Sequence, residues 1–267
     1  MQKTILITGS TDGIGLATAK MLVAQGHKVL LHGRNSTKLA EVETALAATG
    51  GHVESYVADL SRMADVEALA KAVSAKHTQL DVLINNAGVY RTPHSITQDG
   101  LDIRFVVNTI APYRLTQRLM PLMGADGRVI NLSSAAQSPV DTAAMAGQTA
   151  LTEGTAYAQS KLALTMWSYS MALARKENGP MIVAVNPGSL LGSKMVKEAF
   201  GIAGSDIGIG ADILTRAALS AEFATASGQY FDNDAGQFAS PHPDALDVQK
   251  CAAIVQAIEA ILVAIGE

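Results

Sequence analysis

Two side chains that can exchange a proton lie one helical turn apart near the middle of the chain. The stretch "AYAQSKLAL" places Tyr157 and Lys161 four residues apart, and side chains at this spacing share one face of a helix. A phenol with a pKa near ~10 is a poor base at neutral pH, but a nearby cation favours its ionised form. The pair can serve as a general acid and base, or it can simply lie on a helix surface. A tyrosine and a lysine alone do not decide between the two.

A glycine-rich turn lies near the start of the chain. The segment "TGSTDGIG", residues 8–15, joins an expected strand to an expected helix and contains Gly9, Gly13 and Gly15. Glycines at such a turn let the backbone approach a pyrophosphate, whose charge is stabilised by the N-terminus of the following helix. Because the turn opens a strand–helix–strand unit, it predicts a dinucleotide site.

The whole chain alternates short apolar runs with longer helical segments. The expected strands are 3–8, 28–32, 52–58, 80–85, 128–133, 181–186 and 228–231. The expected helices are 14–25, 37–48, 62–76, 99–122 and 156–176, with an apolar terminal helix at 251–265 that is too short to span a bilayer. Continuous apolar strands separated by helices indicate a parallel sheet covered on both faces. We therefore expect a doubly wound, Rossmann-like α/β fold of about seven strands, forming one domain over residues 1–267.

Two long connections interrupt this rhythm. Residues 135–154 are rich in Ala, Thr and Gly, and residues 188–210 follow the sixth expected strand. Both lie after the carboxyl ends of strands, where open α/β sheets bind ligands. We expect them to form substrate loops, with 188–210 acting as a lid over the ligands.

Composition limits the classes of function. The chain is 48% hydrophobic and 16% charged with a net charge of −4, so it can bury a large core and has no basic stripe for nucleic acid. Cys251 is the only cysteine, which excludes an intramolecular disulfide. The six histidines are dispersed, so we expect no metal site and mostly surface or loop positions for them. The first residues run directly into a strand, which favours a cytoplasmic protein without an export signal.

Further motifs point to a family. "NNAG" (85–88) follows the fourth expected strand, "SS" (133–134) follows the fifth, and "YAQSK" (157–161) follows later in the same order. Together with the glycine turn, these motifs resemble the short-chain dehydrogenases/reductases over residues 3–190. Beyond that point, "GQYF" and a terminal helix are similar to the retinol dehydrogenase-like reductases. The gap between Ser134 and Tyr157 is longer than in many members of the family.

The resemblance implies a hydride transfer between a nicotinamide and a carbonyl or alcohol, with four catalytic residues. It implies that Tyr157 is the general acid or base, and that Lys161 assists it and holds the nicotinamide ribose. It implies that Ser134 binds the substrate oxygen, where negative charge develops. Ser133 or Ser138 would take this role if the loop followed a different path. Asn108, in "FVVNTIAPY", matches the asparagine that supports a water-linked proton path to the lysine.

The choice of cofactor depends on the end of the second strand, "LLHGRN". Arg34 stands there with no acidic residue close by, and an arginine can pair with the 2′-phosphate of NADP. We therefore expect NADP(H) rather than NAD(H), although Asp12 adds a negative charge to the glycine turn. The expected cofactor-binding residues are Gly9, Ser10, Thr11, Asp12, Gly13, Ile14, Gly15, Arg34, Asn35, Asp59, Leu60, Asn86, Ala87, Gly88, Tyr157, Lys161, Pro187 and Gly188.

The substrate, partners and rival functions are less constrained. The candidate pocket residues are mostly apolar and hint at an apolar carbonyl or alcohol; they are Tyr90, Arg91, His94, Met145, Leu190, Met195 and Phe200. Relatives commonly pair through the helices 99–122 and 156–176, so we expect a homodimer or homotetramer. The alternative functions are a catalytically silent protein that senses a dinucleotide, and an epimerase or dehydratase that uses the same tyrosine.

Overall fold

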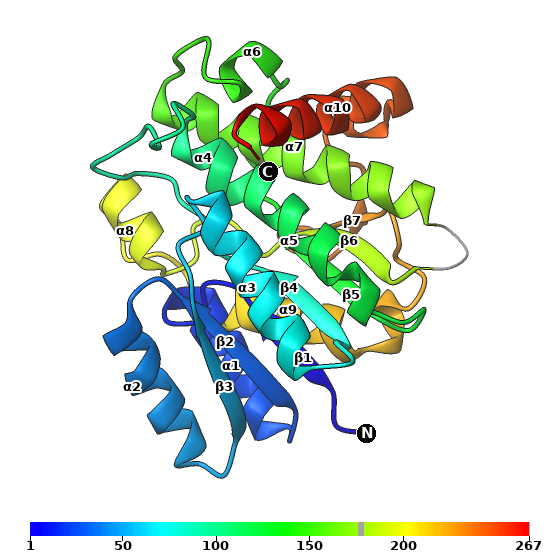
Figure 1. The fold of residues 1–267 in the computed structure, drawn as a ribbon. Coiled ribbons are helices and arrows are strands. Elements are labelled where there is room, and N and C mark those ends of the chain that lie inside the picture. The colour runs from blue at the N-terminus through cyan, green and yellow to red at the C-terminus, as the bar shows by residue number, and fades with distance from the viewer. Residues whose placement is uncertain (176–178, 267) are drawn as a thin grey trace.

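The computed structural model describes residues 1–175 and 179–266, and its centre is one sheet of eight strands (Figure 1). The strand order is β3-β2-β1-β4-β5-β6-β7-β8. All neighbouring pairs are parallel except β7 and β8, which are antiparallel. The strands are β1 (Thr4–Ile7), β2 (Lys28–Gly33), β3 (His52–Val57), β4 (Val82–Asn85), β5 (Arg128–Leu132), β6 (Met181–Asn186), β7 (Tyr230–Asp232) and β8 (Gln237–Ala239). The expected doubly wound sheet is confirmed.

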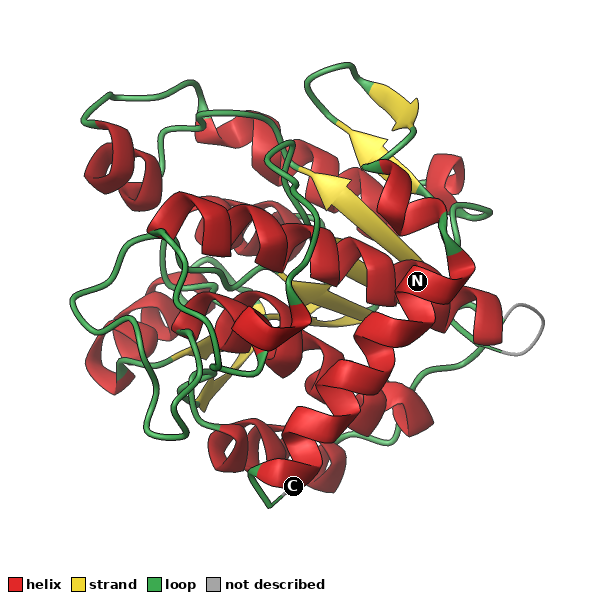
Figure 2. Ribbon diagram, turned by 90° about the horizontal axis from the view of Figure 1, so that it is seen from above, coloured by secondary structure: helices red, strands yellow, loops and turns green. Residues whose placement is uncertain are grey.

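Helices cover both faces of this sheet (Figure 2). One face carries α1 (Gly13–Ala24), α2 (Ser36–Ala47) and α9 (Ile207–Leu219). The other carries α3 (Met63–Lys76), α5 (Ala111–Leu119), α7 (Glu153–Ala174) and α10 (Val248–Ala264). Short helices are α4 (Ile103–Phe105), α6 (Thr142–Met145) and α8 (Lys194–Phe200), with 3-10 turns at Met120–Leu122, Ala221–Phe223 and Pro243–Leu246.

Alternate residues of the central strands are buried on opposite faces. Ile5 and Ile7 pack with the α1 side of the sheet, whereas Leu6 packs with the α3 side, and all three are fully buried. Successive side chains of a strand point to opposite faces. A strand buried on both faces therefore shows a continuous apolar run.

The helix expected at 99–122 has a more complex structure. It begins at Ile103 because Gly100 has a positive φ of 78° and Asp102 caps the helix by accepting a hydrogen bond from the amide of Arg104. Residues Val106–Ile110 form a π-helical turn before α5 begins. Such turns widen a helix locally and often occur at functional sites.

The two long connections contain helices that the sequence did not suggest. Residues 135–154 include α6, and 188–210 include α8 and the first turn of α9. The helix expected at 156–176 starts earlier, at Glu153, where Thr152 caps it; its expected last residue lies outside the described part of the chain.

The terminal helix α10 packs along α7, as Figure 1 shows. Cys251, Ile254 and Ile258 are buried in this contact region, and the hydroxyl of Tyr113 on α5 donates a hydrogen bond to Glu259 of α10. The helix therefore covers part of the surface on which we expected subunits to pair. Within residues 1–175 and 179–266, no helix combines the length and apolar character needed to cross a membrane.

Candidate active site

The glycine turn lies at the carboxyl end of β1 and leads into α1. Gly9 has a φ of +67° and Gly13 a φ of +55°, which glycine adopts without strain. A Cβ on Gly15 would lie 2.3 Å from the carbonyl oxygen of Gly9, so only glycine fits there. The side-chain Nδ2 of Asn86 donates hydrogen bonds to the carbonyls of Thr8 and Gly9 and so joins the second motif to the first. This compact turn at a helix N-terminus fits a dinucleotide pyrophosphate.

His32, on β2, holds the glycine turn through a hydrogen bond to its backbone. It is 3% exposed, its Nδ1 accepts a 3.0 Å hydrogen bond from the amide of Gly9, and its Nε2 lies 3.1 Å from the carbonyl of Ala58. The ring therefore carries its proton on Nε2. Burial lowers the pKa of His32 to about 4, so the ring is neutral at pH 7. The expectation that the histidines lie mostly at the surface is wrong for this residue.

Asp12 does not oppose an anionic ligand as its charge suggested. Its side chain caps α1 by accepting a hydrogen bond from the amide of Gly13 and forms a 2.7 Å ion pair with Lys38. The hydrogen bond from Lys38 lowers the pKa of Asp12, and the charge of Lys194 contributes. The aspartate is therefore ionised, and the positive charge of Lys38 offsets its own.

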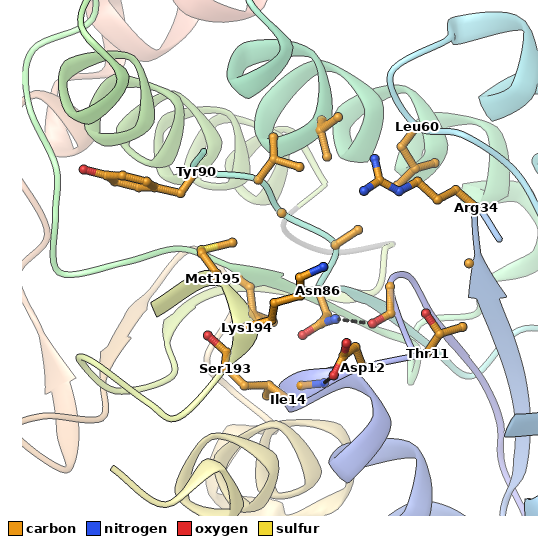
Figure 3. A pocket seen from close by; sticks show the side chains of 18 of the residues that line it. Thr11, Asp12, Ile14, Arg34, Leu60, Asn86, Tyr90, Ser193, Lys194 and Met195 are labelled. Carbon is orange, nitrogen blue, oxygen red and sulfur yellow. Dashed lines mark hydrogen bonds between the residues drawn. The ribbon is translucent and has the colours of Figure 1, made fainter. Parts of the chain in front are cut away.

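Arg34 lies at the end of β2, where the sequence placed the cofactor-selecting cation. It is exposed and lines the cavity beside Leu60 (Figure 3). Asn35 caps α2 by accepting a hydrogen bond from the amide of Lys38, so it shapes this end of the cavity without lining it. Asp59 lines the wall, and its carboxylate accepts hydrogen bonds from the amide and hydroxyl of Ser61.

Tyr157 and Lys161 lie at the other end of the cavity, on consecutive turns of α7. Lys161 is 4% exposed, donates a 2.7 Å hydrogen bond to the carbonyl of Leu132, and lies 5.7 Å from the centre of the Tyr157 ring. Burial lowers the pKa of Lys161 to about 8. Burial raises the pKa of Tyr157, while a hydrogen bond with the hydroxyl of Ser134 acts in the opposite direction. The helix thus places a protonated phenol beside a cation.

Ser134 is the serine that reaches Tyr157, although it is not part of the cavity wall itself. Its carbonyl accepts hydrogen bonds from Tyr230 (3.1 Å) and Gln137 (2.9 Å), which fix the backbone here. Ser133 is buried, and its hydroxyl is engaged by Thr165 at 2.7 Å. Ser133 lines the cavity, but its hydroxyl is already bonded to Thr165, whereas the hydroxyl of Ser134 is bonded to Tyr157. Ser134 therefore stays the candidate for a role at the reacting centre.

Asn108 lies in the π-helical turn, and its side chain is hydrogen-bonded to the backbone of the segment that follows β4. Its Oδ1 accepts a 2.8 Å hydrogen bond from the amide of Val89, while its Nδ2 donates to the carbonyl of Val89 and to the hydroxyl of Ser160, each at 3.0 Å. The side chain is 2% exposed. Asn108 therefore joins the "NNAG" turn to α7, between Tyr157 and Lys161.

The cavity has a volume of about 380 Å³, within the range of small-molecule sites. Of the expected residues, the wall contains Gly9, Thr11, Asp12, Gly13, Ile14, Arg34, Asp59, Leu60, Asn86, Ala87, Gly88, Tyr157, Lys161 and Pro187. Ser10, Gly15, Asn35, Asn108, Ser134 and Gly188 lie outside the wall. Ser10, for example, is fully buried and hydrogen-bonded to the backbone of His32.

The candidate substrate residues divide between the cavity wall and positions away from it. Tyr90, Arg91 and Met195 line the cavity, and the ring of Tyr90 lies 4.9 Å from that of Tyr157 and 5.7 Å from that of Phe200. Met145 is fully buried in the core, because α6 folds back onto the domain, and its assignment to the pocket is wrong. His94 and Leu190 are exposed and do not line the cavity.

Sequence reasoning missed three polar wall residues from one segment. Ser193, Lys194 and Glu198 line the cavity from α8 and its cap. The segment 188–210 was singled out by its length and position, but nothing in its pattern indicated which side chains turn toward the cavity.

Comparison with known proteins identifies the family. Residues 3–201 match the family model described as short chain dehydrogenase. The chain belongs to this family. Human retinol dehydrogenase 13 is 30% identical over 266 residues, an alignment that covers 92% of this chain and 80% of that protein. This likeness confirms the retinol dehydrogenase-like subgroup.

Two solved structures share the fold. A structure of an uncharacterised protein from Mycobacterium paratuberculosis superposes with a TM-score of 0.82 at 25% identity, covering 97% of this chain and 93% of that one. A metagenomic short-chain oxidoreductase in complex with NADP has a TM-score of 0.62 at 30% identity, covering 81% and 90%. The family membership makes this chain an oxidoreductase of the short-chain type.

Proposed function

We propose that this dehydrogenase is an NADP(H)-dependent enzyme that transfers a hydride between the nicotinamide and a carbonyl or alcohol. The observation that carries the proposal is one cavity with Arg34 and the glycine turn at one end and Tyr157 with Lys161 at the other. A dinucleotide bound along this cavity would supply or accept the hydride. The chain then acts as one catalytic domain.

The side chains of the site divide the remaining work. Tyr157 donates a proton to the developing alkoxide, or removes it when an alcohol is oxidised. Lys161, whose ammonium lies near the ring, favours the ionised phenol and would hold the ribose. Ser134 donates to the substrate oxygen. Asn108 positions the backbone between them through its pairing with Val89.

Preference for NADP(H) rests on Arg34. The arginine lies exposed at the end of β2 and lines the cavity, where a guanidinium can form a bidentate contact with the 2′-phosphate. The metagenomic relative was solved with NADP, which supports the same choice here.

The test is a fluorescence titration with NADPH and NADH for the wild type, Arg34→Ala and Arg62→Ala. Arg62 is a matched control because it is an exposed arginine outside the cavity wall. We expect NADPH to bind at least tenfold more tightly than NADH, with the preference lost only in Arg34→Ala. Equal binding of both nucleotides by the wild type would remove the NADP preference but leave the oxidoreductase.

The substrate we propose is an apolar carbonyl or alcohol. Tyr90 and Met195 line the substrate end, and the ring of Phe200 packs against that of Tyr90 at a tilt of 47°. A relative is named retinol dehydrogenase 13, which fits an apolar substrate. A panel of carbonyl compounds assayed for NADPH oxidation tests this class, because hydrophilic sugars turned over best would contradict it.

The alternative is a silent protein that senses a dinucleotide and signals through a partner. The joint presence of Tyr157, Lys161 and Ser134 near one cavity favours catalysis over sensing, because sensing needs no proton donor. The second alternative is an epimerase or dehydratase, which would leave its nucleotide with no net change in oxidation state.

A homodimer or homotetramer and a cytoplasmic location stay predictions. Because α10 already occupies part of the expected pairing surface, pairing would use the surface that remains.

A further inference from the structure

The segment after β6 carries a lysine that no expected role uses. Lys194 is the first residue of α8, and its side chain lines the cavity. Figure 3 shows its side chain among those that line the cavity. Its ammonium lies 3.5 Å from Glu198 one turn along the same helix, and such an exposed pair is weak and easily exchanged for another partner.

Apart from Lys194, the described residues place no cation in the middle of the cavity that is free of a carboxylate partner on the glycine turn. Arg34 lies at the adenosine end, and Lys161 is buried at the nicotinamide end with its ammonium on Leu132. Arg91 pairs with Glu153 at 3.0 Å. The glycine turn lies between these ends, and there Asp12 and Lys38 offset each other in an ion pair.

Lys194 faces this middle stretch. Its positive charge is close enough to Asp12 to help lower the pKa of that carboxyl. The residue before it, Ser193, has its Cβ 3.8 Å from the position that a Cβ on Gly13 would occupy, so the start of α8 lies next to the glycine turn. A pyrophosphate placed on the glycine turn would carry two negative charges between the amides of the turn and the ammonium of Lys194.

We propose that Lys194 binds the pyrophosphate of the dinucleotide from α8, next to the glycine turn, and that this contact holds the 188–210 segment over the cofactor. The proposal rests on the proposed function, since it needs a dinucleotide in the cavity. Lys194 then exchanges Glu198 for the phosphate. The segment that contributes Met195 to the substrate end is fixed only after the cofactor has bound.

The experiment compares two ligands on the purified full-length chain. NADPH contains the pyrophosphate, whereas 2′-AMP contains the 2′-phosphate without it. Lys194→Ala is expected to weaken NADPH about tenfold, as for loss of a charged contact, and to leave 2′-AMP unchanged. Lys194→Arg keeps most of the affinity. Lys197→Ala is the matched control, because Lys197 is an exposed lysine of the same helix outside the wall.

The outcomes separate this proposal from the proposed function. If Lys194→Ala binds NADPH within twofold of the wild type while Arg34→Ala weakens it, the lysine contact is wrong and the dinucleotide site stands. If Lys194→Ala weakens the binding of both ligands equally, Lys194 does not bind the pyrophosphate. If the wild type binds neither ligand, both proposals fail together.

Limited proteolysis tests whether Lys194 holds residues 188–210 over the bound cofactor. At equal NADPH occupancy, we expect residues 188–210 to be protected in the wild type and in Lys197→Ala, and to stay cleavable in Lys194→Ala. Equal protection in all three proteins would show that the lysine binds phosphate without holding the segment. Lack of protection in the wild type would overturn the same part of the proposal.

Discussion

The ammonium of Lys161 lies over the ring of Tyr157, 5.7 Å from the ring centre. The same ammonium donates to the carbonyl of Leu132 in a buried position. Burial lowers the pKa of Lys161 to about 8, so a protonated lysine costs the folded state free energy at neutral pH. The buried ammonium therefore lowers the stability of the folded protein at neutral pH.

Replacing Lys161 by methionine should therefore stabilise the protein without cofactor while abolishing most activity. The cost of the buried ammonium is complete below about pH 8 and disappears as the pH approaches ~10.5, the value of an unperturbed lysine. At pH 7 we expect Lys161→Met to raise the free energy of unfolding by about 1–2 kcal/mol, because the unpaired Leu132 carbonyl offsets part of the gain. Urea unfolding at pH 7 and pH 9.5 measures this, with a smaller advantage at the higher pH. A less stable variant at pH 7 would contradict it.

Ser134 and Ser133 provide a matched pair of variants. Ser134→Ala removes the hydroxyl beside Tyr157, so kcat should fall by about 10²–10³-fold, as for loss of one donor to a developing oxyanion. Ser133→Ala removes the hydroxyl bonded to Thr165 and should lower the free energy of unfolding by about 1–2 kcal/mol with little change in kcat. Steady-state kinetics and urea unfolding on both variants test this, and the reverse assignment of effects would overturn the role of Ser134.

Because of His32, we predict that the free energy of unfolding falls in mild acid. Its pKa is lowered to about 4 in the folded protein against 6.5 in its unperturbed state, so the unfolded chain binds a proton first as the pH falls. The contribution of neutral His32 to the free energy of unfolding is complete above about pH 6.5 and is lost progressively as the pH falls to about 4. Between pH 8 and pH 5 the loss is about 2 kcal/mol. Urea unfolding of the wild type and His32→Asn measures it. Parallel pH dependence of the two proteins would show that His32 is not the cause.

Tyr90 should select for flat apolar substrates. Its ring makes tilted contacts with the rings of Tyr157 and Phe200, and its carbonyl accepts a 3.0 Å hydrogen bond from the buried guanidinium of Arg104. Tyr90→Leu should raise KM for an aromatic ketone about 3–10-fold, the value of one aromatic contact, and leave KM for a small aliphatic ketone unchanged. Kinetics with the two ketones check this. An equal rise for both would indicate general disruption of the site.

The sequence predicted the parts of the molecule whose function demands particular residue types. The glycine turn requires glycine at Gly9 and Gly13 because their φ values are positive, and the central strands require apolar residues on both faces. It did not predict β8, which has three residues and no apolar pattern, nor α9, whose first turn contains Gly208 and Gly210.

Residues that depend on the path of a loop were harder to place. Lys194 and Met145 both lie in long connections, yet one reaches the cavity and the other is fully buried. Neither outcome follows from local periodicity, because tertiary packing determines which way these segments fold back. The π-helical turn that presents Asn108 likewise has no sequence signature that we recognised.

The most direct test of the oxidoreductase proposal is to follow the transferred hydrogen. NADPH carrying deuterium at both positions of C4 of the nicotinamide is incubated with a panel of apolar ketones and aldehydes, using the wild type and Tyr157→Phe, and the alcohols are analysed by mass spectrometry. We predict one deuterium per alcohol molecule with the wild type, and at least 10²-fold less product with a Tyr157→Phe variant that still binds NADPH. If the wild type binds NADPH but transfers no deuterium to any carbonyl compound, the sensing alternative gains and the oxidoreductase proposal is contradicted.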